Sequence, residues 1–364
     1  MTFEETVNYL FNSAPLFQNV GAGAYKEGLS NTHKLDEHFC HPHTHYKTVH
    51  VAGTNGKGSC SHTLASILQA SGLKVGLFTS PHLVDFRERI RVNGQMISKE
   101  FVVDFVEKER NFFESLHPSF FELTTAMAFN YFEEQNVDIA VVEVGLGGRL
   151  DCTNIITPVV SVITNISFDH TAFLGDTLQK IASEKAGIIK KGIPVVIGES
   201  VKETRNVFER KANEVNSPIL FAEDKNNIIN YQIMENGRIL YNTTNYGLIN
   251  GELGGFCQIK NTNTILNAID LLKEQGFDIK DTDVHKGFAN VCEMTGLMGR
   301  WQTIQERPKV VCDTGHNVGG FEWITKQLNE VACHKRIVFG MVNDKDIDGV
   351  LNMLPKNATY YYCE

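Results

Sequence analysis

The sequence predicts an α/β fold built on a mostly parallel sheet, with a second and smaller α/β unit after it. Nearly continuous apolar runs alternate with helical patterns from residue 48 onwards, as in a parallel sheet covered on both faces. Gly-rich turns follow two of these runs directly, at residues 53–58 and 145–148. Since a domain usually holds about 100–200 residues, we expect two domains, residues 1–295 and 296–364.

The first domain begins with 45 residues of helical and then loop-like pattern. Apolar runs and helical spacing then predict strands and helices in alternation. The strands are expected at residues 48–52, 74–79, 137–144, 158–166 and 193–197, and the helices at 59–71 and 177–190. Residues 226–255 are rich in Asn, Tyr and Gly, and their alternation of polar with apolar positions predicts an appended antiparallel region. A further helix is expected at residues 261–275.

The second domain is predicted to be a small Rossmann-like α/β unit. Its strands are expected at residues 309–312, 336–341 and 359–363, with a helix at 320–332 between the first two. One βαβ unit and one further strand are too few for a complete doubly wound sheet. We therefore expect this domain to be incomplete in the chain.

Composition excludes some classes of function. The 34 basic and 43 acidic residues leave a net charge of -9, which argues against a nucleic-acid partner held by a broad basic surface. No apolar run approaches the roughly 18 residues of a membrane span, and the acidic N-terminus is unlike a signal peptide. The eight cysteines form no CxxC pair. We expect a reduced, cytoplasmic protein that binds neither membranes nor nucleic acid.

A histidine-rich segment precedes the first predicted strand. It contains Cys40 and four histidines, namely His38, His41, His43 and His45. This composition suggests either a metal site or a solvated polar loop. The alternating spacing is not a recognised zinc pattern, so we favour the loop.

The strongest local motif is the Gly-rich segment between the first strand and the first helix of the alternation. It consists of Gly53, Thr54, Asn55, Gly56, Lys57, Gly58 and Ser59. Glycines allow consecutive backbone N–H groups to face a phosphate, and the helix start adds its positive dipole end. Lys57 adds a mobile charge for the outer phosphates, and Ser59 a hydroxyl for Mg²⁺. The motif is shorter than a strict Walker sequence, but it predicts nucleotide binding.

Three further residues stand out near predicted strand and helix ends. Glu143 ends the apolar run 137–144, and His170 follows the run 158–166. Ligands of open parallel sheets bind at such carboxyl ends, and a carboxylate with one imidazole suits Mg²⁺. Lys185 lies on the apolar side of the helix expected at 177–190, where a lysine requires a specific role.

With these pieces, the chain resembles the folylpolyglutamate synthase/dihydrofolate synthase family of the Mur ligase superfamily. The shared motifs run through the whole chain in the family's order. They are residues 50–59, 79–83, 86–90, 143–151, 153–154, 169–170, 184–188, 299–302 and 313–317. The sequence departs from the family pattern at Cys257 and at Thr262, and within residues 313–318. The polar residues of those segments are kept.

The resemblance implies a Mur-ligase-like P-loop domain followed by a glutamate-ligase domain. The implied activity is ATP-dependent amide ligation, in which ATP converts a carboxylate into an acyl phosphate and L-glutamate attacks it. Lys57 would hold the β- and γ-phosphates, and Lys185 would carry a carbamate. Two Mg²⁺ ions are implied, with Ser59, Ser80, Glu143 and His170 as ligands. Asn261, Arg300 and Asp313 would contact the nucleotide, and His316 would lie near the transferred phosphate.

The resemblance also implies the acceptor substrates. Arg89, Arg149 and Asp151 match a segment that contacts the pterin in bifunctional members, so we expect the chain to act on both dihydropteroate and reduced folates, as a monomer. For Asp151, the residues alone also allow a loop or helix cap. Three alternatives are a monofunctional polyglutamylase, another Mur-type amino-acid ligase and an ATP-binding regulator. Another Mur-type ligase would need an N-terminal domain for a UDP-sugar, and the 45 residues before the first strand are too few for such a domain.

Overall fold

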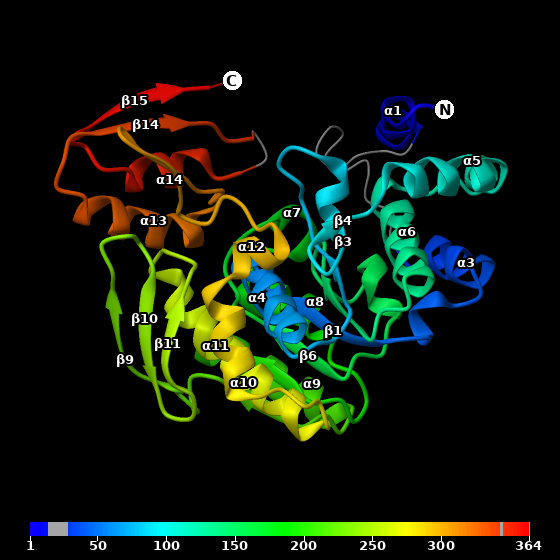
Figure 1. The fold of residues 1–364 in the computed structure, drawn as a ribbon, viewed down its shortest axis with the longest axis horizontal. Coiled ribbons are helices and arrows are strands. Elements are labelled where there is room, and N and C mark those ends of the chain that lie inside the picture. Colours follow the sequence, from blue (N-terminus) through cyan, green and yellow to red (C-terminus); the bar gives the residue numbers. More distant parts are fainter. Residues whose placement is uncertain (14–27, 343–344, 364) are drawn as a thin grey trace.

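The computed structural model describes residues 1–13, 28–342 and 345–363 (Figure 1). Its centre is a sheet with strand order β4-β3-β2-β5-β1-β6-β7-β8. The strands from β2 to β8 in that order are parallel, and β3 and β4 are antiparallel at one edge. Their bounds are β1 Lys47–Ala52, β2 Val75–Phe78, β3 Ile90–Val92, β4 Gln95–Met96, β5 Ile139–Glu143, β6 Val160–Ile163, β7 Val195–Ile197 and β8 Ile219–Phe221. The predicted α/β class with a mostly parallel sheet is confirmed.

Both faces of this sheet are buried, which explains the nearly continuous apolar strands. In β5, Ile139 and Val141 pack with α4, α10 and α11 on one face, while Ala140 and Val142 pack with α5 and α6 on the other. Alternate residues of a strand point to opposite faces, so both sets must be apolar here. Helices α8 and α9 cover the second face beside β6 and β7.

Several helices begin where the sequence offers a side-chain cap. Ser119 starts α6 with a capping box to Glu122, and the Thr177 hydroxyl accepts from the Lys180 N–H at the start of α8. The helices up to α12 are α1 Phe3–Ser13, α3 Ser30–His38, α4 Lys57–Ala70, α5 Lys99–Leu116, α6 Phe120–Glu134, α7 Thr171–Leu174, α8 Leu178–Ala186, α9 Lys202–Glu214, α10 Cys257–Glu274, α11 Asp281–Ala289 and α12 Val291–Thr295. Short 3-10 turns are η2 Pro42–Thr44, η3 Phe86–Arg89 and η4 Cys152–Ile155. No helix in the described ranges is long and apolar enough to span a bilayer.

Most predicted elements of the first domain are present, with shifted ends. The antiparallel region is confirmed as a three-stranded sheet of β9 Ile228–Ile233, β10 Ile239–Thr243 and β11 Gly247–Gly251. Helix α10 starts before residue 261, and α8 ends before residue 190, because Gly187 caps it. The helical and then loop-like pattern predicted for the first 45 residues is present as α1, α3 and η2, and its middle part lies outside the described residues.

The last part of the chain differs from the predicted βαβ unit. Strands β12 Gln302–Glu306 and β13 Lys309–Cys312 form an antiparallel hairpin. Strands β14 Lys335–Phe339 and β15 Ala358–Tyr362 pair in parallel around α14 Ile347–Met353, and α13 Val318–Glu330 precedes them. The prediction that residues 309–312 and 336–341 belong to one βαβ unit is wrong in its pairing, because the tight turn at Arg307-Pro308 brings β12 to β13 first. We call residues 299–342 and 345–362 the C-terminal unit; in Figure 1 its labelled elements α13, α14, β14 and β15 lie on the same side of the molecule as β9–β11.

Two buried histidines make the fold sensitive to acid. His50 in β1 and His62 in α4 are almost fully buried, and burial lowers the pKa of each to about 3. An unfolded histidine titrates near pH 6.5, so acid protonates the unfolded chain first and the stabilisation is lost as pH falls below that value. Between pH 7 and pH 5, we expect the free energy of unfolding to fall by about 2 kcal/mol for each histidine.

Urea unfolding of the His62→Gln variant tests this pH dependence. Glutamine can keep the hydrogen bond that joins the His62 ring to Thr295 Oγ1 over 2.8 Å, but it does not titrate. The variant should therefore lose about 2 kcal/mol less than the wild type between the two pH values. An equal loss in both proteins would contradict a neutral, buried His62.

Candidate active site

The Gly-rich loop joins β1 to α4. It lies at the topological switch point of the sheet, where the strand order reverses. Strand β1 lies between β5 and β6, so all three strands deliver their carboxyl ends to this loop. Gly53 has φ +145° and Gly56 has φ +83°, which side chains rarely adopt. A Cβ on Gly53 would lie 1.8 Å from Thr164 Oγ1, and one on Gly56 would lie 2.4 Å from Asn261 Oδ1. The loop is therefore packed tightly on its neighbours.

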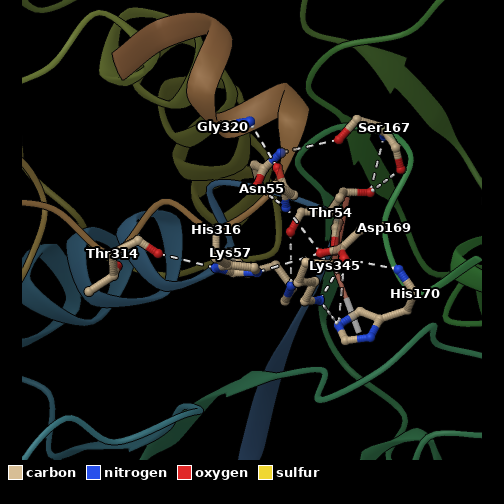
Figure 2. Close-up of polar contacts among 12 residues, drawn as sticks. Thr54, Asn55, Lys57, Ser167, Asp169, His170, Thr314, His316, Gly320 and Lys345 are labelled. Carbon is tan, nitrogen blue, oxygen red and sulfur yellow. Dashed lines mark hydrogen bonds and ion pairs between the residues drawn. The ribbon is translucent and has the colours of Figure 1, made fainter. Parts of the chain in front are cut away.

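The segment after β6 holds this loop in place (Figure 2). Asn55 donates its backbone N–H to Asn165 Oδ1 over 2.8 Å and its side-chain amide to Ser167 Oγ over 3.1 Å. Thr54 Oγ1 donates to the Ser167 carbonyl and accepts from its N–H, each over 3.1 Å. The sequence reasoning missed Asn165 and Ser167. Asn165 could have been found, because it follows a strand next to β1.

Two lysines converge on one carbonyl of the loop. Lys57 Nζ donates to the carbonyls of Gly53 and Thr54, each over 3.1 Å, and Lys185 Nζ donates to Gly53 over 2.9 Å. Lys185 is only 4% exposed. Burial lowers its pKa to about 7, with a smaller contribution from the positive charge of Lys57. Near neutral pH, much of Lys185 is therefore an uncharged amine.

Glu143 lies buried at the end of β5, near the positive charges of Lys57 and Arg300. Its Oε2 accepts the backbone N–H of Ser80 over 3.3 Å. Burial raises the pKa of Glu143, while the charges of Lys57, Arg300 and Arg89 oppose that rise. The site therefore joins an acidic group to three cations drawn from segments far apart in the chain.

A buried amide connects the loop to α10. Gln258 Nε2 donates to Ser59 Oγ over 3.1 Å, and Gln258 Oε1 accepts from Asn261 Nδ2 over 2.9 Å. Gln258 is 3% exposed, and the sequence reasoning did not select it. Ser59 and Asn261 are thereby held in one hydrogen-bonded chain behind the loop.

The C-terminal unit brings further predicted residues to the loop. The Arg300 guanidinium lies close enough to Gly58 that a Cβ there would approach Nη2 to 3.0 Å. His316 Nε2 lies 3.5 Å from Asp169 Oδ2. The oxygens of Asp313 accept the N–H groups of Trp301 and Gly315, each over 2.8 Å.

The donor set fits Mg²⁺ only together with phosphate oxygens. In the described part of the chain, no three His, Cys, Asp or Glu residues gather as a metal site. Glu143 supplies one buried carboxylate, and Ser59 a hydroxyl beside the loop. Mg²⁺ is commonly held by one or two carboxylates with water and substrate phosphates. These residues fit that mode of binding.

The three residues predicted to bind the pterin each have different partners. Arg89 is 4% exposed and donates through Nε to His82 Nδ1 over 2.8 Å. Arg149 is half exposed and pairs with Glu184 over 2.9 Å. Asp151 is buried as the N-cap of η4, as the cap alternative predicted. Its oxygens accept the Thr153 N–H over 3.0 Å and the Leu146 N–H over 2.8 Å.

The histidine-rich segment is a network of hydrogen bonds from imidazole rings to carboxylates. His41 and His43 both contact Asp36, over 2.6 and 2.8 Å, while His38 and His45 contact Glu109 and Glu133. Across the described residues it forms no candidate metal site. These contacts favour the polar-loop interpretation.

Comparisons with known proteins agree with this geometry. The Mur ligase middle domain family matches residues 51–262. A dihydrofolate synthase/folylpolyglutamate synthase from Bacillus subtilis is 36% identical over 342 residues, which cover 90% of this chain and 79% of that protein.

Solved structures give the same result. A complex of FPGS with AMPPCP and folate superposes with a TM-score of 0.88 at 30% identity, covering 100% of this chain and 89% of that one. Escherichia coli FolC in complex with DHPP and ADP has a TM-score of 0.80 at 30% identity, covering 99% and 83%. The Mur-ligase-like fold expected from the sequence is confirmed. The chain belongs to the dihydrofolate synthase/folylpolyglutamate synthase family of Mur ligases.

Proposed function

We propose that this chain is an ATP-dependent ligase that joins L-glutamate to dihydropteroate, forming dihydrofolate, and to folyl(poly)glutamates. The γ-phosphoryl group of ATP passes to the acceptor carboxylate, and the glutamate amine attacks the acyl phosphate, so that an amide forms and ADP and phosphate leave. Complexes of family members with ATP analogues, folate and DHPP support this assignment. The alternative of a monofunctional folylpolyglutamate synthase is distinguished below.

The observation that carries the proposal is the convergence of Lys57, Lys185 and Glu143 on the Gly-rich loop. Phosphoryl transfer depends mainly on positioning and on neutralising charge. Lys57 and Arg300 supply positive charge beside the loop, and Glu143 supplies a carboxylate. The site lies where the C-terminal unit meets the main sheet, so closure of the two parts can exclude the water that would hydrolyse an acyl phosphate.

Magnesium and a carbamate complete the proposed site. Ser59, Ser80, Glu143 and His170 would hold two Mg²⁺ ions, which neutralise phosphate charge when bound. A carbamate forms when a neutral amine attacks CO₂ and loses a proton. The burial that lowers the pKa of Lys185 to about 7 makes that amine available. The resulting anion can offset the charge of Lys57 and of bound metal.

The remaining proposed roles concern the nucleotide, the transferred phosphate and L-glutamate. We assign Thr54, Asn55, Gly56, Gly58, Asn261, Arg300 and Asp313 to the nucleotide, and His316 to the transferred phosphate. L-Glutamate is proposed to enter from the side of residues 296–364. The boundary at 295–296 remains a prediction, and α12 ends at Thr295. We also propose a cytoplasmic monomer.

The pterin role of Asp151 makes a prediction of its own. Asp151 Oδ1 accepts both the N–H and the hydroxyl of Thr153, while Oδ2 accepts the Leu146 N–H. A pterin donor would therefore bind at Oδ2. We expect Asp151→Ala to raise KM for dihydropteroate by about 10- to 100-fold, with KM for ATP unchanged. Loss of the cap should lower the free energy of unfolding by about 1 kcal/mol. Steady-state kinetics and urea unfolding check both; equal changes in the two KM values would leave Asp151 only its capping role.

The proposed pair of activities is tested by ADP release. The protein is supplied with ATP, Mg²⁺ and L-glutamate, and with either dihydropteroate or a reduced folate as acceptor. We expect glutamate-dependent ADP release with both acceptors. Release with the folate alone would support the monofunctional alternative, and release with neither would contradict the proposed function.

A further inference from the structure

Three side chains of the C-terminal unit converge on the carboxylate of Asp169, in the segment that follows β6 (Figure 2). Lys345 Nζ lies 2.7 Å from Asp169 Oδ1, Asn317 Nδ2 donates to Asp169 Oδ2 over 3.0 Å, and His316 Nε2 lies 3.5 Å from the same oxygen. Lys345 Nζ also lies 3.0 Å from His170 Nε2. Asp169, which precedes the predicted ligand His170, is therefore held by three side chains of the C-terminal unit.

The pair of Lys345 and Asp169 is shielded from water. Their side chains are 7% and 8% exposed. Removing one member of such a pair leaves an uncompensated buried charge, unlike the loss of an ion pair on the surface.

The same contacts place the neighbour of His316, Asn317, on the Gly-rich loop. Asn317, the neighbour of His316, donates to Asn55 Oδ1 over 3.0 Å as well as to Asp169. Asn317 also caps α13 through the Gly320 N–H. A shift of this helix start away from Asp169 would move His316 with it. A displacement of about 1 Å can lower a rate about 100-fold.

We propose that Lys345 is a positioning residue of the ligase: by its ion pair with Asp169 it holds His316 beside that carboxylate and Asn317 against the Gly-rich loop. The Lys345 amine contacts Asp169 and His170, so it acts on His316 and Asn317 through Asp169. The expected effect of Lys345 on kcat rests on the proposed ligase function. The contact between the two parts of the chain stands independently of it.

The test compares Lys345→Met, Lys345→Arg, Asp169→Asn and the double variant of Asp169→Asn with Lys345→Met. We expect Lys345→Met to lower kcat about 100-fold, with AMPPCP binding nearly unchanged. It should also lower thermal stability, because the buried Asp169 charge loses its partner. Lys345→Arg keeps the charge and should recover most of the rate. The double variant should be no slower than Asp169→Asn alone, because both changes break the same pair.

Gln327→Ala is the matched control, since Gln327 Oε1 accepts the Phe256 N–H over 3.0 Å at a different contact between the two parts. It should leave kcat within about 2-fold of the wild type. An unchanged kcat in Lys345→Met, the absence of recovery in Lys345→Arg, or multiplied losses in the double variant would overturn the proposal.

Hydrogen–deuterium exchange tests the Lys345 contact independently of the proposed ligase activity. Lys345→Met should raise amide exchange in residues 316–321 and 165–170, whereas Gln327→Ala should not. Faster exchange in a protein whose wild type lacks ligase activity would support the Lys345 contact and reject the proposed function. Unchanged exchange in an active wild-type background would reject the role of Lys345 alone.

Discussion

Lys185→Ala is expected to lower kcat by about 1,000-fold while AMPPCP binding stays within about 3-fold of the wild type. The Lys185 amine is buried beside the Gly53 carbonyl, behind the loop rather than at its helix start. Its removal takes away the proposed carbamate and its negative charge but leaves the backbone of the loop in place. The measurement is steady-state kinetics together with calorimetric titration of AMPPCP.

Lys335→Ala is the control for this variant. Lys335 is also buried, and its Nζ donates to the Val331 carbonyl over 3.0 Å, but it is the first residue of β14, away from the Gly-rich loop. We expect Lys335→Ala to affect stability more than turnover. Removal of CO₂ from the buffer should lower the wild-type rate, and added bicarbonate should restore it. Lost AMPPCP binding in Lys185→Ala would make Lys185 structural instead.

Lys57→Ala is expected to lower kcat/KM for ATP by about 100- to 1,000-fold. Lys57 is the first residue of α4, and its Nζ lies with the two loop carbonyls and near Glu143. Since the developing phosphate charge must be balanced in the transition state, kcat should fall along with ATP affinity. Steady-state kinetics at varied ATP concentration measures both.

Lys57→Arg distinguishes charge from geometry at this position. Arginine keeps the positive charge but is longer and planar, so we expect only part of the activity to return. Circular dichroism should show that both variants are folded. A kcat/KM for Lys57→Ala within about 3-fold of the wild type would contradict the assignment of Lys57 to the phosphates.

Much of the main sheet and of its loop could be predicted because local signals agree with the fold. The strands β1, β5 and β6 are apolar runs, and parallel strands bring their carboxyl ends to one edge. Lys57, Glu143 and His170 all follow from that rule. The burial of Lys185 was also indicated, by the alanine and glycine that flank it.

What the sequence did not indicate depends on contacts between distant segments. Gln258 lies 199 positions from Ser59, and Lys345 lies 176 positions from Asp169. No period or spacing relates such pairs, because only the packing of the units brings them together. The pairing of β12 with β13 was missed for a different reason: the turn at Arg307-Pro308 did not enter the prediction, and propensity alone does not choose a strand's partner.

The formation of an acyl phosphate in this site is tested most directly by oxygen transfer. Dihydropteroate labelled with ¹⁸O in its carboxylate is incubated with the protein, ATP, Mg²⁺ and L-glutamate, and the released phosphate is analysed by mass spectrometry. The account predicts that one ¹⁸O atom appears in inorganic phosphate for each dihydrofolate formed. Unlabelled phosphate, or ¹⁸O recovered in AMP, would contradict it.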